Sequence, residues 1–284
     1  MIGLFYWFML LLLGAGAGFA GAISGLGGGV LIIPALTLLF GMPLEIAAGA
    51  SLVSTIATSS GAASAYIKDR LANIKIGMSL EMATTAGAIA GSLIAVTLYA
   101  KNLAYVVFII FGAVLLASAY PQIKKLNKKA YRINKPDAST RILQLSGSYY
   151  DEASGKTIRY NAVRWAYGEV VMLFAGIISG LLGVGSGVLK VIGMDDAMRL
   201  PIKVTTATSD FMIGVTAAAS GAVYWIFGYI KPEIVAPIVI GVVAGSYMGT
   251  KFMERSQSRM IRIIFIVMLA LVGVEMVLRG LGVA

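Results

Sequence analysis

Two glycine-rich breaks interrupt apolar stretches of the chain, and their composition suits them to binding a small anion. They are Gly27-Gly28-Gly29 and, 158 residues later, Gly185-Ser186-Gly187. Consecutive glycines cost a helix about 1 kcal/mol each relative to alanine, so they end the helix and leave backbone N–H groups that can point at a ligand. A helix that restarts after the break adds partial positive charge at its N-terminus, which binds anions without Lys or Arg. The alternative interpretation is a tight structural turn that lets helices pack closely.

Hydroxyl side chains follow both breaks at the same spacing. Pro43 and Pro201 lie fourteen residues after the last glycine of each break, and Ser51 and Ser209 lie eight residues further on. Proline suits the first turn of a helix, so each serine is expected about two turns into a helix. Hydroxyls in apolar helices often only bond back to their own backbone, but the equal spacing favours Ser51 and Ser209 as anion ligands. Other hydroxyl residues lie close by, and the first of them, Ser54, is a further candidate ligand: Ser54, Thr55, Thr58, Thr205, Thr206 and Thr208.

One carboxylate lies inside an apolar run. Asp210 is followed by Phe211-Met212-Ile213-Gly214-Val215, and a charge in such a place is costly enough to indicate a function. We expect Asp210 to couple transport to H⁺ or Na⁺; the alternative is a structural ion pair with Lys203 or Lys190. The two lysines could also add positive charge to an anion site. The first half has Leu52 where the second has Asp210. Three other carboxylates lie near the ends of apolar segments and are expected at the membrane interface: Glu81, Glu169 and Glu233.

The residues that are missing exclude several kinds of chemistry. The chain has no Cys and no His, which excludes thiol chemistry, disulfide bonds and most haem, zinc and copper sites. It also lacks the commonest general base and any pairing of a nucleophile with a base. We therefore expect no metal, no cofactor and no enzyme activity. No Gly-Lys-Ser/Thr follows either break, so neither is a phosphate-binding P-loop and nothing indicates ATP use.

The elements that position these residues must be membrane helices. Hydrophobic residues make up 58% of the chain and charged residues 13%, which is about half the usual charged share of a soluble domain. The mean hydropathy is +0.87, and several apolar runs reach about 20 residues, the length of a spanning helix. The sequence therefore predicts an all-α, polytopic protein of the cytoplasmic membrane. Its net charge of +10 lies mostly in loops, which indicates membrane topology and not nucleic-acid binding.

The apolar segments form two sets that resemble each other. They lie at about 3–40, 46–67, 76–99 and 103–120, and again at about 166–200, 204–230, 233–250 and 261–280. Besides the breaks, Gly87-Ala88-Ile89-Ala90-Gly91-Ser92 matches Gly241-Val242-Val243-Ala244-Gly245-Ser246. Glycines spaced by four residues, as in this motif, are typical of close helix packing in membranes. We therefore expect two homologous transmembrane repeats, 1–120 and 165–284.

The linker between the repeats, 121–164, is basic. Within it, Leu143 to Tyr150 and Thr157 to Tyr160 flank a turn-like sequence, which is typical of a β-hairpin. The linker has no apolar run, so we expect a solvated cytoplasmic loop; a regulatory or partner-binding role is the alternative.

The distribution of Lys and Arg favours one membrane topology. If each half has four spans, fifteen of these residues lie on one side and eight on the other. If instead each glycine break folds its segment back, as a re-entrant element, the counts become twenty and three. Because charge bias on short loops sets orientation, we expect inverted-topology repeats with about eight to ten transmembrane segments. The amino terminus then lies outside and the linker lies in the cytoplasm.

These residues resemble those of a known family. Paired S-G-x-G-G-G-type loops, each followed by Pro and a small-residue stretch ending in Ser, are similar to the TauE/SafE family of sulfite exporters, and so is Gly-x-x-Ala-Gly-Ser in each half. The second loop departs from the pattern, because Gly185-Ser186-Gly187 follows three extra residues. The resemblance implies a secondary transporter that exports sulfite or an organosulfonate.

The residues leave a second transport mechanism open. An anion channel, or a cation-coupled importer of a small anion with Asp210 as the ion ligand, fits the same sequence. The expected partners are therefore a small anionic substrate, the lipid bilayer and a coupling H⁺ or Na⁺. An integral membrane enzyme is disfavoured, since no catalytic constellation is present.

Overall fold

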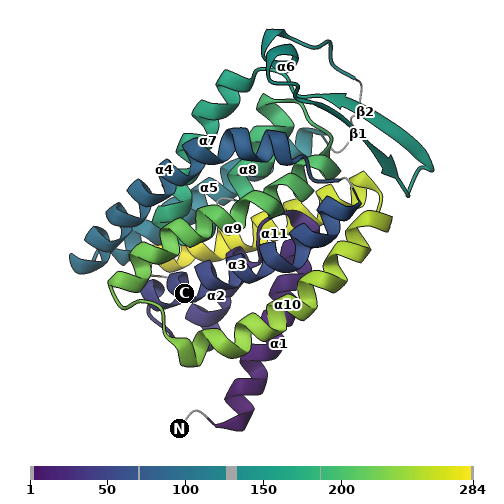
Figure 1. Ribbon diagram of the computed structural model, residues 1–284. Coiled ribbons are helices and arrows are strands. Elements are labelled where there is room, and N and C mark those ends of the chain that lie inside the picture. Colours follow the sequence, from purple (N-terminus) through teal and green to yellow (C-terminus); the bar gives the residue numbers. More distant parts are fainter. Residues whose placement is uncertain (1–2, 70, 126–132, 186, 283–284) are drawn as a thin grey trace.

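The computed structural model describes residues 3–69, 71–125, 133–185 and 187–282, and it consists mainly of long helices (Figure 1). The first half contains α1 (Leu4–Ser24), α2 (Gly29–Leu39), α3 (Leu44–Lys68), α4 (Ile74–Ala100) and α5 (Ala104–Lys125). The linker contains α6 (Ala138–Ile142), β1 (Ser146–Asp151) and β2 (Lys156–Asn161). The second half contains α7 (Trp165–Leu182), α8 (Gly187–Ile192), the π-helical turn η1 (Gly193–Ala197), α9 (Ile202–Ile226), α10 (Pro232–Arg255) and α11 (Ser258–Gly280).

Most of the helices have the dimensions of membrane spans. Among the described residues, seven helices are long and apolar enough to cross a bilayer: α1, α3, α4, α5, α7, α10 and α11. This confirms the prediction of an all-α polytopic membrane protein. Helix α9 equals α3 in length, with 25 residues, but it contains Lys203 and Asp210. Helix α2 has 11 residues, and at 1.5 Å per residue it covers only about half of a 30 Å hydrocarbon layer.

Glycine ends the first helix of each half in the same way. Helix α1 ends at Gly25, with φ 74°, and α7 ends at Gly183, with φ 71°. Two residues further on, Gly27 and Gly185 also have positive φ values, 78° and 73°, which side chains with a Cβ disfavour. The extra residues expected in the second break are therefore absent, because Gly183 and not Gly180 corresponds to Gly25. The two breaks have equal lengths.

After each break the chain turns back along the helix it has just left. In the first half, Gly28 packs against Ala17 and Gly21 of α1. In the second half, Gly193 packs against Val171 and Met172 of α7. The segments predicted as single apolar stretches, 3–40 and 166–200, are thus each folded into a long and a short part.

Small residues let four helices pack in two close pairs. Along α1 and α10, Gly14 lies on Ile238 and Gly18 lies on Val242, so both helices run in the same direction. Helices α4 and α7 make the same parallel contact, through pairs such as Ala88 with Gly180. A Cβ on any of these glycines would overlap the backbone of the partner helix. The four-residue glycine spacing therefore marks helix contacts, as predicted.

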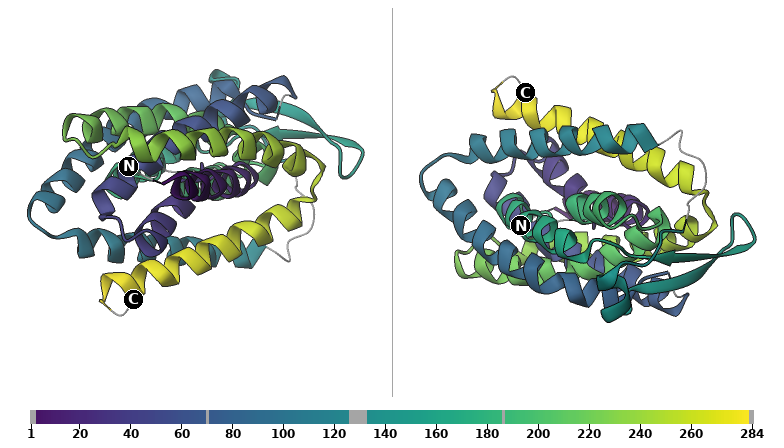
Figure 2. Two further views of the ribbon diagram at one scale, coloured as in Figure 1. Left: turned by 90° about the horizontal axis from the view of Figure 1, so that it is seen from below. Right: turned by 90° about the horizontal axis from the view of Figure 1, so that it is seen from above.

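The pattern of helix pairs is the same for both halves. Helix α1 packs on α10 as α7 packs on α4, and α3 and α5 pair with their counterparts α9 and α11. The contacts of α4 with α9 and of α3 with α10 also correspond. In both views of Figure 2, α11, in yellow, runs along one edge of the molecule with α5 beside it. When each helix is replaced by its counterpart from the other half, these main helix pairs stay the same.

The linker forms a hairpin that packs on the helices (Figure 1). Strands β1 and β2 are antiparallel, with Tyr149 opposite Ile158. Tyr149 and Tyr160 are buried in the same core cluster as residues of α3 and α9, and Asn73 donates a hydrogen bond to the Tyr160 hydroxyl (3.1 Å). We expected a solvated loop; the hairpin is instead partly buried because its two tyrosines cover apolar helix ends.

Candidate functional site

The two glycine breaks lie against each other inside the helix bundle. Ser209 of α9 donates a hydrogen bond to the carbonyl oxygen of Gly25 (2.8 Å), and its hydroxyl lies 3.4 Å from the carbonyl oxygen of Gly187. Gly187 packs directly on the backbone of Gly25, and Gly183 packs on Ala48 of α3. Segments 158 residues apart therefore form one buried site.

On the first-half side of this site, two hydroxyl groups of α3 face Gly29. A Cβ on Gly29 would overlap both Ser51 Oγ and Thr55 Oγ1. The two side chains are completely buried, and neither hydroxyl has a hydrogen-bond partner among the described residues. The Thr55 methyl group also lies against Gly27 of one break and Gly185 of the other. Because an unpartnered buried hydroxyl costs about 1–3 kcal/mol, the pair indicates a place prepared for a ligand.

The other predicted hydroxyl ligands are already engaged. Ser209 bonds to Gly25, as above, and Ser54 donates to the carbonyl oxygen four residues earlier (2.7 Å). Thr206, beside Gly25, is buried and its hydroxyl lacks a partner in the described part of the chain. Of the two serines selected by their spacing, only Ser51 thus presents a free hydroxyl.

The glycine backbone is less available than the sequence suggested. The N–H of Gly29 donates to the carbonyl oxygen of Gly27 (2.8 Å), and the carbonyl oxygen of Gly28 accepts from the first turn of α2. Ser186 lies outside the described residues. The expectation that N–H groups of both breaks bind the anion therefore stays a prediction, and the side-chain hydroxyls are the clearer donors.

Asp210 is fully buried and unpaired. Both of its carboxylate oxygens lack a hydrogen-bond partner among the described residues. Neither lysine considered as its partner pairs with it: Lys203 bonds to Asp151 and Lys190 bonds to Glu81. The ion pair proposed as the structural alternative is therefore not formed. A buried carboxylate without compensation is unfavourable, and this strengthens the expectation of a function.

Lys190 belongs to a buried cluster that joins three helices. Its ammonium group lies 3.1 Å from a carboxylate oxygen of Glu81 on α4, and it also donates to Thr216 on α9. Thr85 donates a further hydrogen bond to Glu81 (3.1 Å). Glu81, which was expected at the membrane interface, is buried inside the helix bundle, where Lys190 compensates its charge.

Lys203 holds the linker hairpin on the helices. Its ammonium group lies 2.8 Å from Asp151 at the end of β1 and 2.8 Å from the carbonyl oxygen of Glu254 on α10. Burial raises the pKa of Asp151, but hydrogen bonds from Lys203 and Ser154 outweigh that effect and hold the pKa below its ordinary value. Lys203 therefore serves the hairpin and, like Lys190, is not a free cation for the anion site.

The sequence did not select every residue that the structure brings into the site. Thr55 and Thr206 were noted only as neighbours of the serines, and Thr216 and Glu81 were not linked to Lys190. A usable signal exists for Thr216, because it lies 158 residues after Thr58, the same offset that relates the two breaks. Thr58 donates to the carbonyl oxygen of Gly27 (3.0 Å) and so supports the first break.

The arrangement can bind a small anion without metal or covalent chemistry. In the described part of the chain, no group of three or more Asp or Glu side chains could hold a metal ion. The free donors are hydroxyl groups, which bind an oxyanion by hydrogen bonds.

The chain is similar in sequence to membrane transporters. Residues 10–276 match the family described as Sulfite exporter TauE/SafE. The chain is 29% identical over 281 residues to the Probable membrane transporter protein YunE of Bacillus subtilis (strain 168), covering 96% of this chain and 98% of that protein. It is 26% identical over 245 residues to the Probable membrane transporter protein YdhB of the same organism, covering 86% and 87%. No solved structure matches the chain.

Proposed function

The chain belongs to the sulfite exporter TauE/SafE family, and on that premise we propose that it exports sulfite or an organosulfonate across the cytoplasmic membrane. It is a membrane transporter and not an enzyme. The observation that carries the proposal is the pair of buried, unpartnered hydroxyls of Ser51 and Thr55, which face Gly29 where the two breaks meet.

The chemistry of this pair fits an oxyanion. A sulfur oxyanion has only acceptor oxygens, while each hydroxyl can donate one hydrogen bond. A hydrogen bond to a charged group contributes about 1.5–3 kcal/mol, so two such bonds can hold the anion without a lysine. The unpaired hydroxyl of Thr206 lies on the second-half side of the same breaks and is a third donor.

The helix directions support inverted repeats. Helices α1 and α3 both run parallel to α10. Along α1, Gly14 and then Gly18 contact Ile238 and then Val242; along α3, Gly49 and then Gly61 contact Tyr229, just before α10, and then Ser246. Helix α4 returns after the short connection that follows α3, and α7 runs parallel to α4. On this reasoning α1 and α7, the first helices of the two halves, point in opposite directions. With the Lys and Arg bias, we infer an external amino terminus and a cytoplasmic linker.

Export of an anion needs no ATP. With the cell interior negative, each negative charge expelled releases about 2.3 kcal/mol per 100 mV, so a dianion gains about 4.6 kcal/mol. The unpaired carboxylate of Asp210 is the residue we assign to a coupling H⁺ or Na⁺. Its place next to Ser209, which bridges the two breaks, connects ion binding to the anion site.

Sulfite efflux from proteoliposomes tests the proposal. The double variant Ser51→Ala/Thr55→Val keeps the shape of the site and removes both free donors, so efflux should fall at least about tenfold. Ser60→Ala is the matched control on α3: Ser60 is exposed and bonds only to the carbonyl oxygen of Ile56 (2.9 Å). Unchanged efflux in the double variant would remove the proposed site.

Transport by a cation-coupled importer or an anion channel is the second candidate function, and the buried carboxylate of Asp210 is the observation that favours the importer. Asp210, as a buried unpaired carboxylate, also suits a cation-coupled importer, and an anion channel would need no coupling at all. A flux that saturates and follows an imposed H⁺ or Na⁺ gradient indicates a carrier, and its direction separates exporter from importer. An ohmic current that ignores both gradients indicates a channel.

A further inference from the structure

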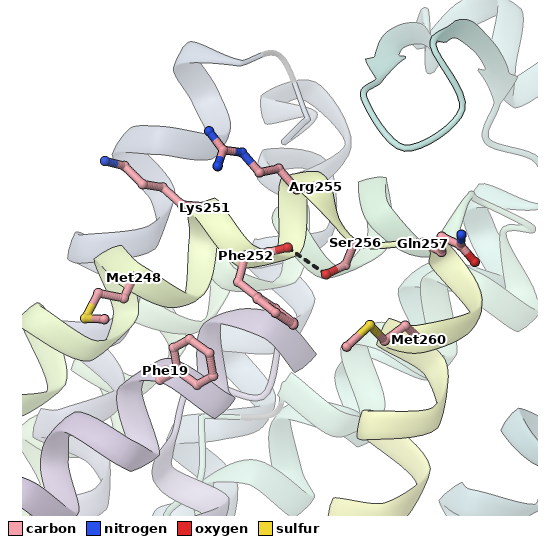
Figure 3. Close-up of a pocket in the computed structure, with 8 residues that line it drawn as sticks. All are labelled: Phe19, Met248, Lys251, Phe252, Arg255, Ser256, Gln257 and Met260. Atoms are coloured by element: carbon pink, nitrogen blue, oxygen red, sulfur yellow. Dashed lines mark hydrogen bonds between the residues drawn. The ribbon is translucent and has the colours of Figure 1, made fainter.

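An opening distinct from the glycine breaks lies where α10 turns into α11. It encloses about 720 Å³ between these two helices and α1. Figure 3 shows Phe19, Phe252 and Met260 turned toward one another, with Lys251 and Arg255 extending from α10 above them. The rings of Phe19 and Phe252 lie 5.8 Å apart. The crevice therefore has an apolar floor and a cationic rim.

The same crevice occurs at the corresponding place in the first half. A smaller opening of about 330 Å³ lies where α4 turns into α5. The offset of 154 residues that relates the Gly-x-x-Ala-Gly-Ser motifs also relates the linings of the two crevices: Ile94 with Met248, Thr97 with Lys251, Leu98 with Phe252, Lys101 with Arg255, and Leu103 with Gln257. The duplication thus preserved the crevice, but only the second copy has two cations.

The surroundings of the larger crevice are membrane-like on one side and basic on the other. Met248 is 64% exposed and Met260 is 45% exposed, as expected for side chains that face acyl chains. Lys251 stacks on the Tyr247 ring (4.5 Å), which holds its ammonium group outward. Arg259 follows on α11 and is exposed too. Cations beside an apolar surface at the end of a membrane helix are complementary to the headgroup and chains of an acidic lipid.

We propose that this crevice binds an anionic phospholipid, with the phosphate on Lys251 and Arg255 and an acyl chain on Phe19, Phe252 and Met260. A small oxyanion such as sulfite would leave the apolar floor uncovered and most of the volume empty. A zwitterionic lipid would cover the floor but would not neutralise two adjacent cations. The first-half crevice has only Lys101 on its rim, so it binds the same lipid more weakly.

Binding is measured with the purified full chain in nanodiscs of phosphatidylcholine to which phosphatidylglycerol is added. The readouts are thermal unfolding and the lipid retained in native mass spectrometry. Wild type should gain thermal stability with phosphatidylglycerol. Lys251→Gln/Arg255→Gln should weaken the apparent affinity at least tenfold, while Lys101→Gln, the matched control, should change it less than twofold. All three side chains are exposed, so the variants should unfold like wild type in pure phosphatidylcholine.

Three results would overturn the proposal. One is equal binding of phosphatidylglycerol by wild type and the double variant. Another is an equal gain in thermal stability when phosphatidylcholine is added instead of phosphatidylglycerol, which would show that the charge of the lipid plays no role. A third is competition by inorganic phosphate or sulfite at the concentration of the lipid, which would assign the crevice to small anions. A photoactivatable phosphatidylglycerol tests wild type directly: it should label the 248–260 peptide, and labelling confined to other helices would contradict the site.

Discussion

The two glycine breaks are followed by segments that match in position but differ in charge. At the offset of 158 residues, Ile32 corresponds to Lys190 and Leu52 corresponds to Asp210. Gly25 and Gly27 of the first break and Gly183 and Gly185 of the second nevertheless share the left-handed conformation, and both breaks are followed by a serine at the same distance. Duplication has therefore kept the backbone of the site and changed its electrostatics.

The difference suggests a division of labour between the halves. The first half contributes neutral donors, because Ser51 and Thr55 are buried with free hydroxyls. The second half contributes ionisable groups, with Asp210 unpaired and Lys190 bound to Glu81. On this view the first half binds the anion and the second half links its movement to an ion. Exchanging residues between matching positions tests each part of the comparison.

The largest effect is expected where the second half has a buried ion pair and the first half has none. Lys190→Met leaves the Glu81 carboxylate buried without its cation, which should lower the free energy of unfolding by roughly 3–5 kcal/mol. Unfolding in mixed detergent micelles measures it. Ile32→Met, at the matching position, should cost less than about 1.5 kcal/mol. Lys190→Met/Glu81→Gln should recover most of the loss; equal stability of all three variants would show that the pair contributes nothing.

Replacing Asp210 by the residue of the first half should separate stability from coupling. Asp210→Leu removes an unpartnered buried carboxylate, so the free energy of unfolding should rise by about 1–3 kcal/mol. The dependence of flux on an imposed H⁺ or Na⁺ gradient should disappear. Leu52→Asp, the reverse change in the first half, should destabilise the protein. A gradient-dependent flux that survives in Asp210→Leu would assign coupling to another group.

A smaller effect should distinguish the two serines. Ser51→Ala should raise the KM for the anion about tenfold and should not lower the free energy of unfolding, because it removes a buried hydroxyl that bonds to nothing in the described chain. Ser209→Ala should instead lose about 1 kcal/mol of stability, since its hydroxyl bonds to Gly25. Efflux kinetics and unfolding of the same preparations measure both. Identical behaviour of the two variants would show that the halves use their serines alike.

The sequence predicted the local elements of this site well. Consecutive glycines destabilise a helix, so the breaks and the short segments after them follow from composition. Pro43 immediately precedes α3, and Pro201 directly precedes α9, so the serine positions could be placed on helices. The hairpin strands also begin and end close to their expected limits. Each of these features depends on neighbours within about ten residues.

Contacts between distant segments could not be predicted. Glu81 and Lys190 are 109 residues apart. Glu81 lies on α4 and Lys190 on α8, the short helix after α7, and α7 packs on α4 through glycines. No local sequence pattern indicates which carboxylate pairs with a given buried lysine. The same holds for Lys203, whose partner Asp151 belongs to a linker expected to be solvated. The largest differences between the sequence-based expectation and the structure therefore concern charged residues that pair with residues far away in the sequence.

The smallest effect is expected at the linker hairpin, which Lys203 of the second half holds on the helices. The matching residue of the first half is Glu45, and the described part of that half contains no strand. Asp151 has a pKa below its ordinary value of 3.8 because hydrogen bonds from Lys203 and Ser154 outweigh burial. Its lowered pKa stabilises the docked hairpin above about pH 4, and this contribution is lost as pH falls through the lowered value.

Hydrogen exchange of the 146–161 peptide should therefore be slower in wild type than in Asp151→Asn. The difference should be constant from pH 5 to pH 8 and should close below about pH 4. A difference that already disappears near pH 6 would mean that another group controls docking. No difference at any pH would mean that the buried tyrosines hold the hairpin without the help of the ion pair.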